Sequence, residues 1–148
     1  MADLSSKRAV KSKKSTTRAL PASAATYYQG ALICWDTSVG RVVKGAVSTT
    51  LRPIGLCAVD KVIGSNGDPL EVVLFRELTT VWMNNLAADP VVAASRGSLC
   101  YIAGDNEVAL TDATNTRSVA GVVWAVDSAK GVEVEPRFSD SRLGGLDA

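Results

Sequence analysis

Short apolar runs between closely spaced turn residues constrain the fold of this chain most. From Tyr27 onward, runs rich in Val, Ile, Leu and aromatic residues are interrupted by Gly, Asp, Asn, Ser and Pro. This punctuation is typical of β-strands joined by tight turns, so we expect an all-β protein. The predicted strands are residues 31–35, 41–44, 54–62, 70–76, 79–83, 99–103, 107–110, 119–126 and 132–137. One helical turn is predicted at residues 90–95, with Asp89 as its cap.

The sequence also resembles itself at a spacing of 67 residues. Gly30 and Leu32 match Gly97 and Leu99, and Ala-Val-Asp recurs at residues 58–60 and 125–127. Seven of 31 positions are identical in this register, against about two expected from composition. We therefore predict two similar β units, about residues 30–78 and 97–138, with one strand order and packed as a small sandwich or barrel. Chance similarity between β segments of like composition is the alternative.

Charge is distributed unevenly along the chain. Residues 1–18 hold six basic residues and one acidic residue, whereas the remainder holds ten basic and fourteen acidic residues. Residues 1–26 carry few large apolar side chains, which predicts an extended basic arm before a β domain at 27–138 and a tail at 139–148. The basic residues predicted to bind a partner are Lys7, Arg8, Lys11, Lys13, Lys14 and Arg18.

Three roles are conceivable for this arm, two of which involve a partner. Phosphate contacts would make it a nucleic-acid tail, but the arm has no interleaved aromatic residues of the kind that bind single strands. An acidic protein surface, including that of another copy of this chain, is therefore favoured. A solvated tail that only aids solubility is the third alternative.

Catalytic chemistry has little support in the sequence. The chain contains no histidine and no glycine-rich nucleotide motif, so we expect no enzyme, no cofactor and no metal site. Asp60 and Asp127 occupy equivalent places in the repeat, and hairpin turns explain them better than an acid/base pair. The solvated strand face explains Glu133 and Glu135 in the same way.

Cysteine and tryptophan residues follow the apolar runs. Cys34, Cys57 and Cys100 lack metal-ligand spacing, which predicts buried free thiols and synthesis in a reducing compartment. The three tryptophans are expected in the core or in an interface. No apolar stretch approaches the length of a membrane span, so no membrane association is expected.

Several of these segments resemble a known class of proteins. Residues 96–111 (RGSLCYIAGDNEVALT), 119–127 (VAGVVWAVD) and 131–138 (GVEVEPRF) are similar to capsid-associated β proteins of tailed bacteriophages. Those proteins share a G-x-x-v-y-v strand, a variable polar loop, a v-G-v-a strand and a final v-x-v-x-l/f strand. Residues 32–43 (LICWDTSVGRVV), 53–60 (PIGLCAVD) and 72–75 (VVLF) resemble the head-decoration proteins of lambda-like phages.

The resemblance implies a structural virion protein. It would be made in the host cytoplasm, bind the outer surface of an icosahedral head and cement neighbouring capsid subunits. Its partners would be the major capsid protein and other copies of itself, in a dimer or a trimer, with the arm reaching onto neighbours. A nucleic-acid-binding module with a basic tail is the alternative function.

Overall fold

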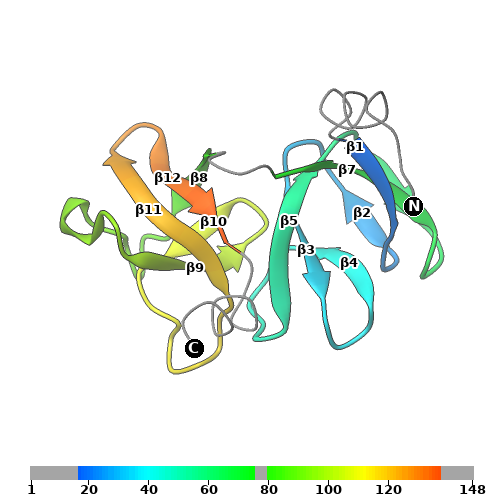
Figure 1. Cartoon of the computed structure of the whole chain (residues 1–148), viewed down its shortest axis with the longest axis horizontal. Coiled ribbons are helices and arrows are strands. Elements are labelled where there is room, and N and C mark those ends of the chain that lie inside the picture. Colours follow the sequence, from blue (N-terminus) through cyan, green and yellow to red (C-terminus); the bar gives the residue numbers. More distant parts are fainter. Residues whose placement is uncertain (1–16, 76–79, 138–148) are drawn as a thin grey trace, which may run out of the picture.

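Apolar runs of the sequence form strands, and the protein is all-β (Figure 1). The computed structural model describes residues 17–75 and 80–137. Within them, the strands are β1 (Thr17–Pro21), β2 (Ala25–Tyr27), β3 (Leu32–Asp36), β4 (Arg41–Lys44), β5 (Leu51–Cys57), β6 (Lys61–Ile63), β7 (Pro69–Leu74), β8 (Val81–Asn85), β9 (Leu99–Gly104), β10 (Glu107–Ala109), β11 (Val119–Asp127) and β12 (Gly131–Pro136), with a 3₁₀ turn η1 (Ala93–Ser95).

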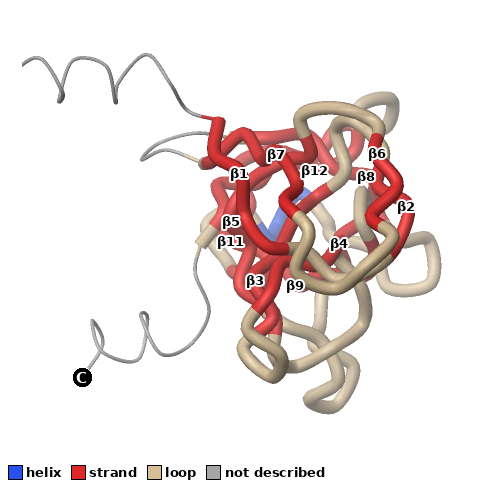
Figure 2. Tube along the Cα trace, turned by 90° about the vertical axis from the view of Figure 1, so that its right-hand side faces the viewer, coloured by secondary structure: helices blue, strands red, loops and turns tan. Residues whose placement is uncertain are grey.

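The first unit comprises β1 to β7. Five of its strands form a sheet in the order β1-β7-β5-β3-β4, with antiparallel neighbours. A parallel bridge between Ala22 and Val42 brings the end of β1 to β4 and curls the sheet toward closure. The remaining strands, β2 and β6, pair with each other in a separate two-stranded ribbon. Seen from the side of this unit, the strands wind around a common interior instead of lying flat (Figure 2).

A closed barrel forms the second unit, with the strand order β8-β12-β11-β9-β10. Strand β10 closes it by pairing in parallel with β8, where Val108 lies opposite Asn85. This order matches that of the first unit strand for strand, and both units close through a parallel contact at the same place. The predicted repeat of two similar β units with one strand order is therefore confirmed, but each unit begins earlier than predicted, at β1 and at β8.

Details of the register repeat as well. Gly30 and Gly97 both have left-handed backbone, with φ of 90° and 89°, and donate their N–H groups to Cys57 and Val123. The register slips by one residue between β3 and β5 and again between β9 and β11.

The spacing between matching residues is not constant along the repeat. The stretch from Ile102 to its partner Val108 is one residue shorter than the matching stretch from Trp35 to Val42, so matching residues in β4 and β10 and in β5 and β11 are 66 apart. A bulge at Trp124 adds one residue to β11 and restores the spacing of 67 at Ala58 and Ala125. The sequence identities at Ala46 and Thr49 therefore do not reflect matching positions.

Some predicted elements differ from the structure. Residues 54–62 form parts of two strands, because the chain leaves the sheet after Cys57 and β6 pairs with β2. Residues 17–26, expected in the extended arm, form β1 and most of β2, and β1 pairs with β7 along its length. The helical turn is confined to η1, and Asp89 does not cap it, because its carboxylate binds Thr111 and Arg117 instead.

Two apolar cores underlie the units. The core of the first unit includes Tyr27, Ile33, Val42, Leu70 and Val72, each at most 1% exposed. The core of the second unit is extended by three residues of the first, Leu32, Cys34 and Leu51. The units therefore share one continuous apolar interface.

Candidate functional site

The predicted partner-binding residues fall in two regions. Lys7, Arg8, Lys11, Lys13 and Lys14 lie outside the described residues. Arg18 lies in β1, opposite Val72 of β7, and its side chain is exposed. The structure thus places one basic residue of the arm on the surface of the first unit.

A tryptophan wall, made of Trp82, Trp124, Glu133 and Glu135, is the most developed surface of the second unit. Trp82 in β8 and Trp124 in β11 are each 42% exposed. The two residues lie on either side of β12. Trp82 in β8 pairs with Glu133 of β12, and the bulge at Trp124 in β11 lies beside the same part of β12. These two indoles are therefore not core residues, whereas Trp35 is half-buried against the first core.

Neighbouring side chains fix both indoles in place. The Trp124 Nε1 donates a hydrogen bond of 2.8 Å to Glu135, which also pairs with Arg137 at 3.4 Å. Arg96 lies over the Trp124 ring, 5.9 Å from its centroid. Held in this way, an exposed indole loses little side-chain entropy when it meets a partner, which favours binding.

A cation also lies against Trp82. Lys130 lies over its ring, 5.4 Å from the centroid. Glu133 accepts a hydrogen bond of 2.7 Å from Thr80 at the edge of the wall. The alternation of Val132 to Glu135 predicts that the glutamates face outward. The exposure of Trp124 depends on the bulge, which the sequence pattern does not reveal.

The repeated aspartates do not form an acid/base pair. Asp127 accepts hydrogen bonds from the Ala129 and Lys130 amides, which lower its pKa and fix the hairpin turn as predicted. Asp60 accepts its bond from the Gln29 amide at 2.8 Å, so it ties two loops together and does not form the predicted hairpin turn. Each carboxylate is thus bound to main chain within its own unit.

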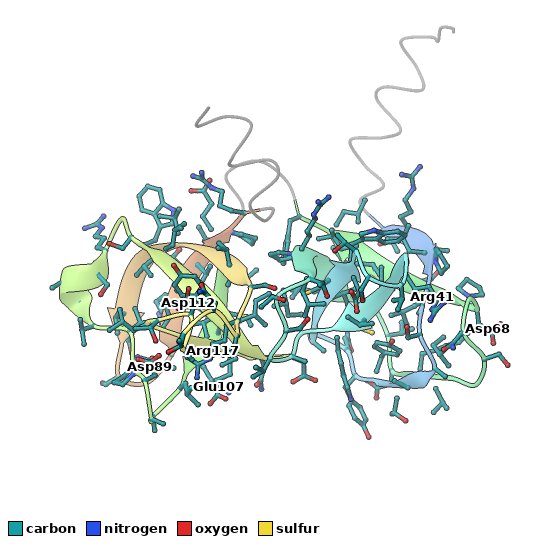
Figure 3. All side chains as sticks on the ribbon, turned by 90° about the horizontal axis from the view of Figure 1, so that it is seen from below. Arg41, Asp68, Asp89, Glu107, Asp112 and Arg117 are labelled. Atoms are coloured by element: carbon teal, nitrogen blue, oxygen red, sulfur yellow. The ribbon has the colours of Figure 1, made fainter. Side chains whose placement is uncertain are left out.

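A loop network surrounds Asp89 and Arg117, which Figure 3 shows beside Asp112 on the second unit. Asp89 accepts hydrogen bonds from the Thr111 hydroxyl at 2.6 Å and from Arg117 at 2.8 Å. These contacts lower the pKa of Asp89. They hold the loop of residues 111–117, which has three consecutive left-handed residues (Ala113, Thr114 and Asn115). The network explains the loop's shape and does not require a ligand.

All three cysteines are buried free thiols, as predicted. Burial raises the pKa of Cys34 and Cys57, and raises that of Cys100 to about 12. Thiols with raised pKa values are poor nucleophiles near neutral pH. Their placement supports a packing role.

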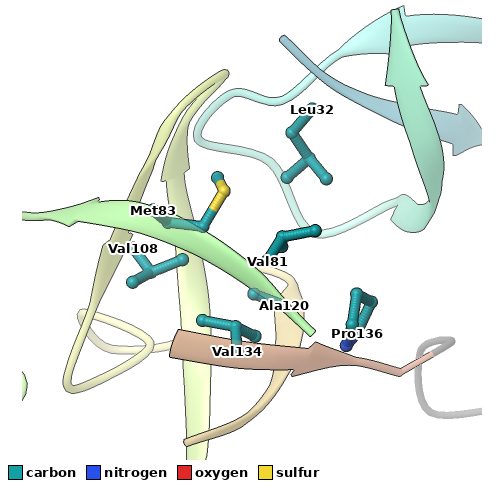
Figure 4. Close-up of a pocket in the computed structure, with 7 residues that line it drawn as sticks. All are labelled: Leu32, Val81, Met83, Val108, Ala120, Val134 and Pro136. Atoms are coloured by element: carbon teal, nitrogen blue, oxygen red, sulfur yellow. The ribbon is translucent and has the colours of Figure 1, made fainter. Parts of the chain in front are cut away.

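An apolar cavity of about 10 Å³ lies where the units meet, with room for about one water molecule (Figure 4). Its lining comprises Leu32, Val81, Met83, Val108, Ala120, Val134 and Pro136. Because the cavity is small and apolar, we interpret it as imperfect packing around Leu32. We see no substrate site in it.

Over residues 17–75 and 80–137, no group of three potential ligands could hold a metal ion. Among the same residues, no helix has the length and apolar character needed to cross a membrane. No family model, curated protein or solved structure matches the chain.

Proposed function

We propose that this chain is a structural protein of a tailed-phage head, which binds the outer surface of the icosahedral shell and cements neighbouring capsid subunits. The tryptophan wall is the observation that carries the proposal. Its two indoles are half-exposed and mounted on a closed barrel, a cation lies over each ring, and Trp124 also donates a hydrogen bond to Glu135. A rigid aromatic surface of this kind suits docking onto another protein, where buried Trp residues often dominate the binding energy.

Two further features support the same reading. The cavity where the units meet is too small for a substrate, whereas the tryptophan wall is an outer surface open to a partner. The basic residues near the N-terminus offer a second point of attachment to a partner, and their charge is opposite to that of the acidic remainder of the chain. Modest contacts of both kinds are sufficient for a cement protein, because a symmetric lattice repeats each contact many times.

Binding to shells tests the proposal. Purified protein is mixed with empty shells of the phage that encodes it, and the bound fraction is measured by co-sedimentation. We expect saturable binding, weakened at least about tenfold by Trp82→Ala with Trp124→Ala. Tyr28→Ala is the matched control, because Tyr28 is an exposed aromatic residue of the first unit, at 61%. Unchanged binding by the double variant contradicts the role of the wall, and absence of binding contradicts the function.

The arm is tested with the same assay. Replacing Lys11, Lys13 and Lys14 with Ser removes three positive charges and should weaken attachment at physiological salt. Duplex and single-stranded DNA are included as competing ligands. Retention on DNA with no binding to shells would instead favour the nucleic-acid-binding alternative.

A further inference from the structure

The contact between the two units joins two different surfaces. The first unit contributes a plug face, the outer side of β3 with Leu32 and Cys34. The second unit contributes a mouth, the end of its barrel lined by Val81, Met83 and Ala120, into which Leu32 projects (Figure 4). Because the units share one strand order, each of them carries both a plug face and a mouth.

Hydrogen bonds also support this contact. The Leu32 amide donates to the Asp105 carbonyl at 2.6 Å. The buried Ser118 hydroxyl donates to the Ser48 carbonyl at 2.6 Å and accepts from the Leu51 amide at 3.1 Å. The contact is therefore a built interface and not a chance juxtaposition of barrels.

Over residues 17–75 and 80–137, nothing buries the plug face of the second unit at Leu99. Leu32 lies opposite Leu56, and Leu99 lies opposite Val122 in the matching place of the second unit. Leu32 is 3% exposed, whereas Leu99 is 37% exposed. The same position is thus buried in one unit and open in the other.

No described residue covers the mouth of the first unit in the way that Leu32 covers that of the second. Leu20 pairs with Leu70 in the first unit in the same way that Met83 pairs with Val132 in the second, so Leu20 is the counterpart of Met83. In the same comparison, Ile54 is the counterpart of Ala120. Met83 and Ala120 are buried beneath Leu32 at 5% and 4% exposure. Their counterparts Leu20 and Ile54 are half-buried, as are Trp35 and Leu74 beside them.

We propose that the uncovered plug face around Leu99 binds the uncovered mouth of the first unit in a second copy of this chain. Such a contact repeats the interface within the chain and is heterologous, so it builds rings or open chains of copies. Charge is compatible with it, because Arg18 stands at the rim of this mouth in the place of Val81, and Asp112 lies near Tyr101 on the plug face.

The second copy fits less deeply than the interface within the chain. Ile54 and Trp35 are larger than Ala120 and Ile102 at the matching positions, so they fill the mouth of the first unit nearer to its rim. The contact also lacks the tether that raises the local concentration of one unit around the other. Association is therefore weaker than the packing of the units and rises with concentration. It needs no shell, so it stands apart from the proposed function.

Light scattering on a size-exclusion column tests the association with the full chain alone. We expect the apparent mass to rise above 15.5 kDa as the concentration increases. Leu99→Glu should keep the apparent mass at that of one chain at every concentration. The control Val62→Glu changes a valine that is 70% exposed and lies outside both surfaces, so this variant should associate like wild type. A wild-type chain that stays at one mass at every concentration overturns the proposal, as does Leu99→Glu with wild-type association.

Cross-linking tests the polarity of the contact. Within the chain, Leu32 and Val81 line the same cavity. Their counterparts in the proposed contact are Leu99 of one copy and Arg18 of the other, so the cysteines of Leu99→Cys and Arg18→Cys should come close. The native cysteines are buried and do not compete. With an added thiol oxidant to accept the two electrons, we expect mixed disulfide dimers when the two variants are combined, and few dimers of either variant alone. Leu99→Cys dimers that outnumber the mixed dimers would show a face-to-face contact and overturn the head-to-tail arrangement.

Discussion

Gly55 in β5 and Gly121 in β11 hold the same position in the two units. At Gly121 an added Cβ would meet the Glu135 carbonyl, and at Gly55 it would meet the Val73 carbonyl. Neither contact can be relieved by moving a flexible side chain, because both partners are backbone atoms of a paired strand. Close approach of two strands, and not a turn, explains why glycine is needed at both places.

Substitution of either glycine should therefore destabilise the fold. We expect Gly121→Ala and Gly55→Ala each to lower the free energy of unfolding by about 1–3 kcal/mol, as overpacking does elsewhere. Urea unfolding measures the effect. Gly64→Ala is the control, since no atom lies within 4 Å of its added Cβ. Equal stability of Gly121→Ala and Gly64→Ala would contradict the close approach.

At the scale of elements, β1 completes the sheet of the first unit. It pairs with β7 from Thr17 to Pro21, and the buried Ala22 then bridges Val42. Removing residues 1–22 should lower the melting temperature well below that of a chain lacking residues 1–16, because only the longer deletion removes these pairs. Circular dichroism measures both. Equal melting temperatures for the two truncations would show that β1 contributes no stability.

The 111–117 loop depends on the Asp89 carboxylate. Hydrogen bonds from Thr111 and Arg117 keep the pKa of Asp89 below its usual value, so this contribution to stability is present above about pH 4 and is lost as pH falls through the lowered pKa. We expect Asp89→Asn to unfold more readily than wild type at pH 7, and the difference to shrink below pH 4. Asp68→Asn controls for loss of one surface carboxylate. A pH-independent difference would rule out the ionised form as its cause.

Local pattern predicts elements well where strands are apolar and poorly where distant pairing creates them. The runs around Val42, Val72 and Val132 are strands because β-branched side chains suit a pleated, half-buried surface. Strands β1 and β2 consist largely of Ala, Thr and Pro, and they form because β7 and β6 are available to pair with them. The exposure of Trp124 could not be predicted for a similar reason, since its bulge is a property of two strands together.

For the whole molecule, Leu32 joins the two units into one cooperative structure. It is part of β3 in the first unit, yet its side chain completes the core of the second. We expect Leu32→Ala to lower the free energy of unfolding by about 2–5 kcal/mol. Leu99→Ala changes the matching residue of the second unit, which is 37% exposed, and should cost much less. Calorimetry measures both, and similar losses would contradict the plug.

Strand order in the first unit has a consequence for synthesis on the ribosome. Strand β1 is made well before its partner β7, which ends only at Leu74, after the five intervening strands β2 to β6 have been made. Pairing between such distant segments slows folding, because a long loop must close before any contact forms. The nascent chain therefore carries an unpaired β1 until β7 has emerged, and a chaperone that recognises exposed strands would meet it during that interval.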